Sequence, residues 1–145
     1  MTDDIDHLLL RLLSQDARQS LKSLAQACGL SAPSVAERLR KMEERGELIG
    51  TTVDIDARKF GYQFQALVRI RPLPGHLQVV EQQLIETPQV IECDRITGDD
   101  CFLARLQVRS MDELDVALDA FNLHAQTSTA IVKKSPVKRR LPPLD

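Results

Sequence analysis

Two serine caps and two glycine stops divide residues 20–46 into a pair of helices, a spacing that a helix-turn-helix shares with other three-helix bundles. Ser20 precedes an amphipathic stretch that ends at Gly29, and Ser31 precedes a longer one that ends at Gly46. Serine satisfies free N–H groups at a helix start, and glycine adopts the left-handed conformation at a helix end. Two helices joined by a short turn that carries glycine form the helix-turn-helix pattern.

An additional amphipathic helix is predicted before this pair. Its apolar residues repeat at helical spacing and are Ile5, Leu8, Leu9, Leu12 and Leu13. On the longer helix, Val35, Leu39 and Met42 form an apolar stripe that is expected to face it. The segment 48–55 is β-rich and is interrupted by Gly50, which predicts a small hairpin. The N-terminal part is therefore predicted to be a winged helix-turn-helix domain.

Small polar and basic side chains share a second stripe on the longer helix. A helix that lies in the major groove uses short polar groups near its N-terminus for base edges, and basic groups further along for phosphates. Ser31, Ser34 and Arg38 are accordingly predicted to face bases. Lys41 and Arg45 are predicted to face phosphates.

The charge balance restricts any nucleic-acid interface to a local patch. The net charge of the chain is -2, which excludes a basic coat over the whole surface. Aromatic residues are 3% of the chain and tryptophan is absent, so a stacking platform for single strands is not expected. Residues 18–45 are nevertheless net basic. The alternative interpretation of this basic stripe is a solvated helix face with ion pairs such as Glu37–Lys41.

No cofactor, metal site or catalytic group is predicted. The three cysteines, Cys28, Cys93 and Cys101, lack C-x-x-C spacing, so reduced thiols are expected. The apolar run 8–10 is broken at once by Arg11, which is unlike a signal peptide or a membrane span. A cytoplasmic protein is therefore expected.

The second half of the chain changes from helical to alternating periodicity. The expected elements are a strand at 63–70, a helix at 77–85, strands at 90–97 and 101–108 around a turn at 98–100, a helix at 111–121 and a strand at 127–137. This β-α-β-β-α-β order is the ferredoxin-like arrangement, so the fold class is α+β. Two helices cover only one sheet face. Exposed apolar residues are expected on the other face, and they would mark an oligomer interface.

The two halves in this order resemble the Lrp/AsnC (feast/famine) family of transcriptional regulators. The stretch IDHLLLRLLSQDARQSLKSLAQACGLSAPSVAERLRKMEERGELIG resembles the family's DNA-binding domain. Family positions in it are Ser31, Val35, Arg38, Leu39 and Gly46. VIECDRITGDDCFLARLQVRS resembles the effector-loop hairpin, and TSTAIVKKSPVKR resembles the last strand. The resemblance covers almost the whole chain.

The resemblance implies a division of labour along the chain. Residues 1–53 would be the helix-turn-helix DNA-binding domain, 54–61 a connector, and 62–145 an effector-binding and oligomerisation domain of the RAM or ACT-like type. Family members dimerise through the sheets of the second domain and often assemble further into tetramers or octamers. Small effectors, usually amino acids, bind between dimers near the hairpin turn.

The resemblance also implies an effector site. Its residues would be Thr97, Gly98, Asp99, Asp100 and Cys101 from the turn, with Gln126 and Thr127 from the last strand. Many relatives carry Gly-acid-x-Asp at this turn, whereas Cys101 replaces the second acid here. Relatives often have Gly where this chain has Ala125. These departures leave the identity of the effector open, and plain turn chemistry is the alternative role for the two acids.

The function that follows is a sequence-specific, DNA-binding transcriptional regulator that responds to an amino acid or a related small molecule. One alternative is a DNA-architectural protein that needs no effector. Another is an enzyme similar to siroheme decarboxylases, which would need clustered His and Arg side chains. His7, His76 and His124 are scattered along the chain, so a non-enzyme is expected.

Overall fold

The computed structural model describes residues 2–144, which form two compact units. One unit comprises the chain up to Asp54 together with the segment from Pro136 onward, and the other is Ile55–Ser135. The sequence analysis placed this C-terminal segment in the second domain. A hydrogen bond from Arg11 Nη1 to the Leu144 carbonyl oxygen, 2.9 Å long, connects the end of this segment to the first helix, α1 (Asp4–Gln15).

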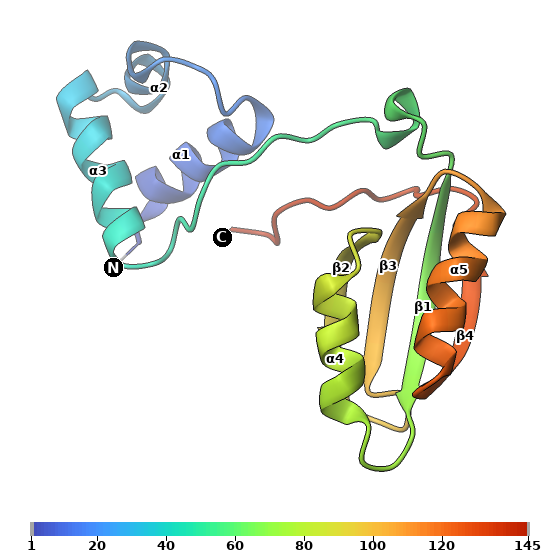
Figure 1. The fold of residues 1–145 in the computed structure, drawn as a ribbon. Coiled ribbons are helices and arrows are strands. Elements are labelled where there is room, and N and C mark those ends of the chain that lie inside the picture. The colour runs from blue at the N-terminus through green and yellow to red at the C-terminus, as the bar shows by residue number, and fades with distance from the viewer. Residues whose placement is uncertain (1, 145) are drawn as a thin grey trace. The chain divides into compact units, whose positions relative to one another are not determined.

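Three helices build the first unit. They are α1 (Asp4–Gln15), α2 (Leu21–Cys28) and α3 (Ala32–Glu44), as Figure 1 shows. The side chains of Asp3, Ser20 and Ser31 each accept a hydrogen bond from a backbone N–H in the first turn of the following helix. Gly29 ends α2 in the left-handed conformation, with φ +67°. The predicted caps, the turn and both helices of the pair are confirmed.

One apolar cluster holds these helices together. Its buried members are Leu9 from α1, Leu24 and Ala25 from α2, and Val35 and Met42 from α3. Leu39 packs against the cluster while partly buried. The apolar stripe predicted on the third helix therefore does face the first helix, which fixes the roll of α3 about its axis and sets which side chains point outward.

The predicted hairpin at 48–55 is wrong. This segment contains no strand, and it leaves Ile49 94% and Val53 84% exposed. A two-stranded hairpin is marginal in water unless it packs on other structure. Nothing in this unit buries these side chains, so their β propensity has no packing to support it. The helix-turn-helix therefore carries no β-wing in the described chain.

The second unit confirms the predicted β-α-β-β-α-β order. Its elements are the short 3₁₀ helix η1 (Ala57–Phe60), then β1 (Phe64–Pro72), α4 (Leu77–Glu86), β2 (Val90–Arg95), β3 (Phe102–Val108), α5 (Met111–Asn122) and β4 (Ala125–Ile131). The sheet order is β2-β3-β1-β4, and all three pairings are antiparallel. The last strand ends at Ile131 rather than at 137, because its partner β1 begins at Phe64: the Val132 N–H still donates to the Gln65 carbonyl oxygen at 2.8 Å, and little of β1 is left to pair beyond that point.

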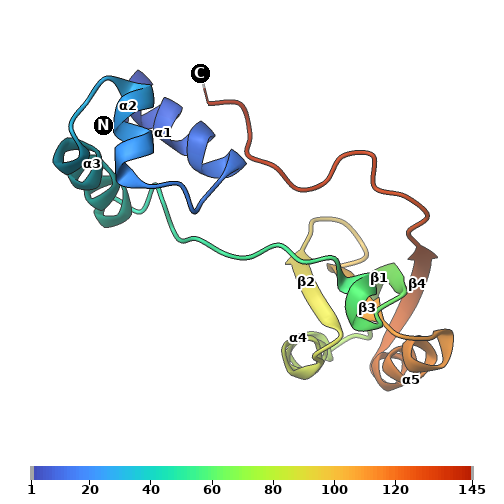
Figure 2. The ribbon, with the colours of Figure 1, turned by 90° about the horizontal axis from the view of Figure 1, so that it is seen from above.

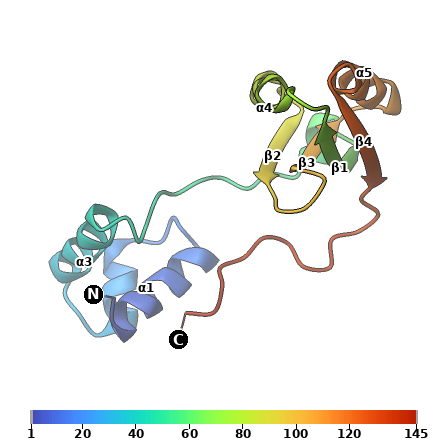
Figure 3. The same cartoon turned by 90° about the horizontal axis from the view of Figure 1, so that it is seen from below.

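Alternation along the two central strands builds the core. Ala66, Val68 and Ile70 of β1 are fully buried. The helices α4 and α5 lie side by side over this face of the sheet, as Figures 2 and 3 show from opposite sides. Phe121 of α5 is also buried in this core. Every second strand residue therefore points to the other, uncovered face.

The uncovered face is mixed rather than apolar, which corrects the expected patch. Leu67 and Arg69 alternate with the buried residues of β1, and their antiparallel partners on β3 are Arg105 and Leu103. Arg105 donates a 3.1 Å hydrogen bond to Gln65 Oε1 on the same face. Periodicity alone identified the face, but it did not reveal that arginine and glutamine fill most of its positions.

Two imidazoles connect the loops at one end of this sheet. His76 begins α4 and His124 follows α5, and their Nδ1 atoms lie 2.9 Å apart. The backbone N–H of Leu73 also donates to the His124 carbonyl oxygen at 2.9 Å. These contacts hold the end of β1 against the start of β4, where Arg71 pairs with Gln126.

Leu9→Ala is expected to destabilise the first unit by about 2–5 kcal/mol, because it removes a fully buried side chain and leaves a cavity. Leu21→Ala is the matched control, since Leu21 is 42% exposed, and it is expected to cost only about 0.5 kcal/mol. Urea unfolding followed by circular dichroism measures both. Equal losses in the two variants would contradict this assignment of the core.

Candidate functional site

A groove lies along the exposed side of α3. Its volume is about 520 Å³, and its lining residues are Asp3, Asp6, Pro33, Ser34, Glu37, Arg38, Lys41 and Arg45. The structure thus brings four of the five predicted DNA-binding residues together. The fifth, Ser31, lies at the start of the same helix. The groove also contains two acidic residues from the start of α1, Asp3 and Asp6, which were not predicted to lie there.

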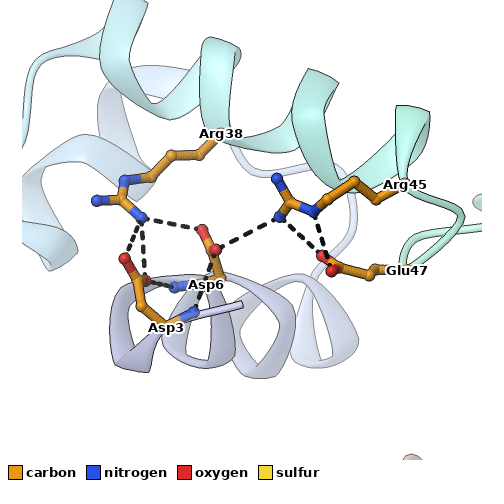
Figure 4. Close-up of polar contacts among 5 residues, drawn as sticks. All are labelled: Asp3, Asp6, Arg38, Arg45 and Glu47. Atoms are coloured by element: carbon orange, nitrogen blue, oxygen red, sulfur yellow. Dashed lines mark hydrogen bonds and ion pairs between the residues drawn. The ribbon is translucent and has the colours of Figure 1, made fainter. Parts of the chain in front are cut away.

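Arg38 is bound by these two acids. Its Nη1 lies 2.8 Å from Asp3 Oδ2, 3.0 Å from Asp3 Oδ1 and 3.1 Å from Asp6 Oδ1 (Figure 4). Asp3 is the N-cap of α1, and the Asp6 side chain is only 5% exposed. A buried carboxylate needs a charged or hydrogen-bonding partner. Arg38 therefore clamps the start of α1 to α3, and its Nη1 is occupied within the protein.

The hydrogen bonds in this cluster favour the charged forms. The bond from Arg38 lowers the pKa of Asp3, and the same contact raises the pKa of Arg38. Arg45 Nη2 lies 2.8 Å from Glu47 Oε2 and 3.8 Å from Asp6 Oδ2 (Figure 4). This guanidinium lowers the pKa of Glu47 to about 2. Both predicted basic contacts at 38 and 45 are thus already paired with acids of the same unit.

Other polar residues of α3 and its N-cap also have partners within the protein. The Ser31 hydroxyl accepts from the Ser34 N–H at 3.3 Å and lies 3.0 Å from Ser34 Oγ. Arg40 is paired with Glu37, at 2.5 Å, and with Glu44. The alternative pairing of Glu37 with Lys41 is not formed.

Lys41 differs from the three arginines of this stretch, because its exposed ammonium group is not paired with an acid in the described part of the chain and can bind a ligand. Within residues 2–144 it takes part in no ion pair, and the same holds for Lys22 of α2 and for Arg18 just before α2. Sequence reasoning could not identify this distinction, because the partners of Arg38 come from a helix more than thirty residues earlier in the chain.

The predicted effector turn joins β2 to β3. Gly98 has φ +97° and Cys101 has φ +49°, and Cys101 is the non-glycine residue with positive φ in the described chain. The Ile96 N–H donates to the Cys101 carbonyl oxygen at 2.7 Å, which closes the turn. A left-handed conformation at a residue with a side chain is uncommon and is held here by the surrounding hydrogen bonds.

Two arginines missed by the sequence analysis lie against this turn. Arg71 Nη2 is 3.7 Å from Asp99 Oδ2 and 3.7 Å from Asp100 Oδ1, and Arg69 Nη1 is 3.9 Å from Asp100 Oδ2. Both project from the uncovered face of β1. The alternation of 63–70 was a usable signal, because it predicts that the charged residues of this strand share one face.

The predicted effector residues of the last strand point to different faces of the sheet. Gln126 is the antiparallel partner of Arg71, and directly opposed residues share a sheet face, so Gln126 joins the arginines. Thr127 is the partner of the buried Ile70, and its Oγ1 lies 2.9 Å from Asn122 Oδ1 at the end of α5. Thr127 therefore points away from the turn cluster. Thr97 is exposed on the turn itself.

Within residues 2–144, neither the groove along α3 nor the turn between β2 and β3 contains a disulfide or a metal-binding group of side chains. Cys28, Cys93 and Cys101 are free thiols, and burial raises the pKa of Cys28 and Cys93. Among residues 2–144, no group of three or more His, Cys, Asp or Glu side chains is placed to bind a metal ion. No helix in this range has the length and apolar character needed to cross a membrane.

Family comparisons match both units in the order found here. Residues 3–43 match the AsnC-type helix-turn-helix domain, and residues 65–142 match the Lrp/AsnC ligand binding domain. The chain belongs to the Lrp/AsnC family. This establishes it as a member of a family of helix-turn-helix transcriptional regulators, and it confirms the resemblance drawn from the sequence.

Two curated Lrp/AsnC relatives illustrate the similarity. The HTH-type transcriptional regulator LrpA of Bacillus subtilis is 30% identical over 138 residues, covering 91% of this chain and 98% of that protein. The regulator LrpA of Mycobacterium tuberculosis is 31% identical over 128 residues, covering 88% of this chain and 85% of that protein.

Solved structures show the same architecture. Bacillus subtilis LrpC has a TM-score of 0.90 at 24% identity, covering 96% of this chain and 99% of that chain. The feast or famine regulatory protein from M. tuberculosis, solved in complex with L-methionine, has a TM-score of 0.88 at 29% identity and covers 97% of each chain. This Lrp/AsnC chain is therefore similar in fold to both proteins over almost its whole length.

Glu47→Gln is expected to lower stability at pH 7 and to leave it unchanged near pH 2. The folded pKa of Glu47, about 2, lies below its ordinary value of 4.5, so its contribution is present above pH 4.5 and is lost as the pH falls towards 2. Urea unfolding at pH 7, 4 and 2.5 would measure the shrinking difference from wild type. A difference that stays constant over this range would contradict the Arg45–Glu47 assignment.

Proposed function

We propose that this protein is a sequence-specific, DNA-binding transcriptional regulator that inserts α3 into the major groove and responds to a small amino-acid effector. The observation that carries the proposal is the exposed side of α3, where a groove lined by polar and charged residues stands opposite the buried stripe of Val35 and Met42. This is the placement that a recognition helix of a helix-turn-helix requires. Binding to chromosomal DNA implies a cytoplasmic location.

We assign different roles to the five residues expected to bind DNA. Lys41, which is exposed and free of ion pairs within residues 2–144, contacts a phosphate. Ser34 and Ser31 lie at the N-terminal end of α3, where base edges are read, although Ser31 is also the helix cap. Arg38 and Arg45 chiefly position α3 by pairing with Asp3, Asp6 and Glu47.

Lys22 and Arg18 supply further phosphate contacts. In a helix-turn-helix the first helix of the pair crosses the DNA backbone, and Lys22 is in the first turn of α2. Neither cation is paired within residues 2–144. Together with Lys41 they give a locally basic surface on a chain whose net charge is -2.

A homodimer would present two copies of α3 to successive major grooves, about 34 Å apart along the duplex. The part of the uncovered sheet face around Leu67 and Leu103 is the surface we assign to dimerisation, because these apolar side chains are left without cover by the two helices. Further assembly to tetramers or octamers would bring hairpin turns together.

The effector binds at the turn 97–101 and at Gln126. A similar structure was solved with L-methionine, which supports an amino-acid ligand for this chain. Its ammonium would be accepted by Asp99 or Asp100, and its carboxylate would be held by cationic or backbone N–H groups at the turn. Binding between dimers would shift the population of assemblies and so change promoter occupancy.

A DNA-architectural role without an effector is the second candidate, and the departure at Cys101 is the observation that favours it. An enzyme similar to siroheme decarboxylases has less support. Within residues 2–144, His76 and His124 contact each other, and neither imidazole forms a hydrogen bond with an arginine.

Lys41→Ala is expected to weaken binding to all DNA sequences alike and to lower the slope of log K against log salt by about 1, the effect of losing one phosphate contact. Arg40→Ala is the matched control on the same helix, because Glu37 and Glu44 already neutralise Arg40. Fluorescence anisotropy across a salt series, with DNA from upstream of the gene and a scrambled fragment, measures both. Identical salt slopes for the two variants would contradict this role of Lys41.

Arg38→Ala and Asp3→Asn distinguish a positioning residue from a base contact. If Arg38 positions α3, both variants weaken DNA binding without changing the preference for the upstream fragment over the scrambled one. If Arg38 instead reads a base, Arg38→Ala relaxes discrimination at one base pair by about 1–3 kcal/mol. Asp3→Asn, which removes one of the two acids that hold Arg38, would then leave affinity intact. Binding to a panel of single-base-pair variants separates these results.

A further inference from the structure

The charges at the effector turn are arranged in a row with two exposed ends. Arg71 and Asp100 form the centre of the row, and their side chains are 49% and 33% exposed. Asp99 lies at one end and is 89% exposed, and Arg69 lies at the other and is 66% exposed. The turn cluster, defined as these four residues, therefore presents an exposed carboxylate at one end and an exposed guanidinium at the other.

The internal pairs of the turn cluster are too long to satisfy the arginines. The three N···O distances are 3.7, 3.7 and 3.9 Å. Hydrogen bonds between N–H and O lie at 2.7–3.2 Å, and charge-assisted pairs are usually shorter. By comparison, Arg38 in the other unit forms a full charge-assisted hydrogen bond, with its Nη1 2.8 Å from Asp3 Oδ2. The guanidiniums of the turn cluster thus keep donors for a ligand.

The spacing of the two arginines sets the size of an anionic ligand. Residues two apart on a strand share a face and lie about 6.6 Å apart. Long, flexible arginine side chains can narrow this separation at their tips. The single carboxylate of Asp100 lies 3.9 Å from Arg69 and 3.7 Å from Arg71, beyond hydrogen-bond distance of both, whereas two ligand carboxylates separated by a few carbon atoms can each bind one guanidinium. Guanidinium and carboxylate also match as bidentate partners.

We propose that the effector is an acidic amino acid, with glutamate as the probe that fits. This inference rests on the proposed function and names the class of ligand for the same site. The exposed carboxylate of Asp99 accepts the ligand ammonium, Arg71 holds the α-carboxylate, and Arg69 binds the side-chain carboxylate. Arg69 is thereby the residue that determines specificity. Gln126, beside Arg71 on the same face, adds an amide for the head group.

An apolar amino acid is a poorer match for this cluster. The side chains that surround the turn on the uncovered face are Arg69, Arg71, Asp99, Asp100 and Gln126, and Leu103 is the apolar residue opposite Arg69. An aliphatic ligand side chain placed here would bury guanidinium groups without a hydrogen-bond partner, and that desolvation costs free energy.

Isothermal titration calorimetry of the full chain with L-glutamate, L-glutamine and L-leucine tests the proposal. Glutamine has the shape of glutamate without the second negative charge. We expect glutamate to bind wild type about tenfold more tightly than glutamine, the size of effect that follows from one charge-assisted pair. Arg69→Gln is expected to remove this preference while glutamine binding persists.

Arg105→Gln is the matched control, because it removes the same charge from the same sheet face but at a residue that pairs with Gln65 and Glu92 instead of the turn. It is expected to retain the preference for glutamate. Sedimentation velocity checks that both variants keep the wild-type assembly. Equal binding of glutamate and glutamine, tighter binding of leucine, or a preference that survives Arg69→Gln would each overturn the proposal.

Binding to the upstream DNA fragment in parallel separates this inference from the function on which it rests. Specific DNA binding with no response to glutamate would overturn the ligand class alone, and the regulator would stand. Loss of any preference for the upstream fragment would instead contradict the proposed function. Glutamate binding together with non-specific DNA binding would support the ligand site. The protein would then be a DNA-architectural protein that responds to an effector.

Discussion

The pairing of a buried carboxylate with an arginine from another helix determines how the DNA-binding unit works. Asp6 on α1 is nearly inaccessible to solvent, and Arg38 on α3 supplies its opposite charge at 3.1 Å. Without Arg38, the buried carboxylate of Asp6 would keep only the longer ion pair, with Arg45 at 3.8 Å. The Arg38–Asp6 pair therefore adds a directional restraint between α1 and α3 to the apolar packing of the three helices. A recognition helix that must fit a groove of fixed width benefits from that restriction.

The Arg38 contact also separates what the sequence could predict from what it could not. Serine caps, the left-handed Gly29 and the spacing of Val35 and Met42 are local signals, and they correctly predicted the helices and the buried side of α3. The partners of Arg38 are not local. Its position on a polar stripe was predicted, yet the stripe also faces acids from the start of the chain, and only tertiary structure brings these together.

The second unit repeats this lesson with strands. Alternation predicted the four strands and their helix-covered face, because burial on one side imposes a period of two. The predicted last strand extended to 137, beyond its observed end at Ile131, because sequence does not show where the partner strand begins. In the first unit, a β-rich composition predicted a hairpin at 48–55, but Ile49 and Val53 are exposed there and no strand forms. The turn was correctly identified, whereas Arg69 and Arg71 beside it became visible only through the pairing of β1 with β3.

The segment beyond Pro136 gives the chain an unusual connectivity. Because it joins the first unit, as the Arg11–Leu144 contact illustrates, the sheet unit is inserted within the helical one rather than appended to it. The helical unit is therefore joined to the sheet unit by two covalent connections rather than one.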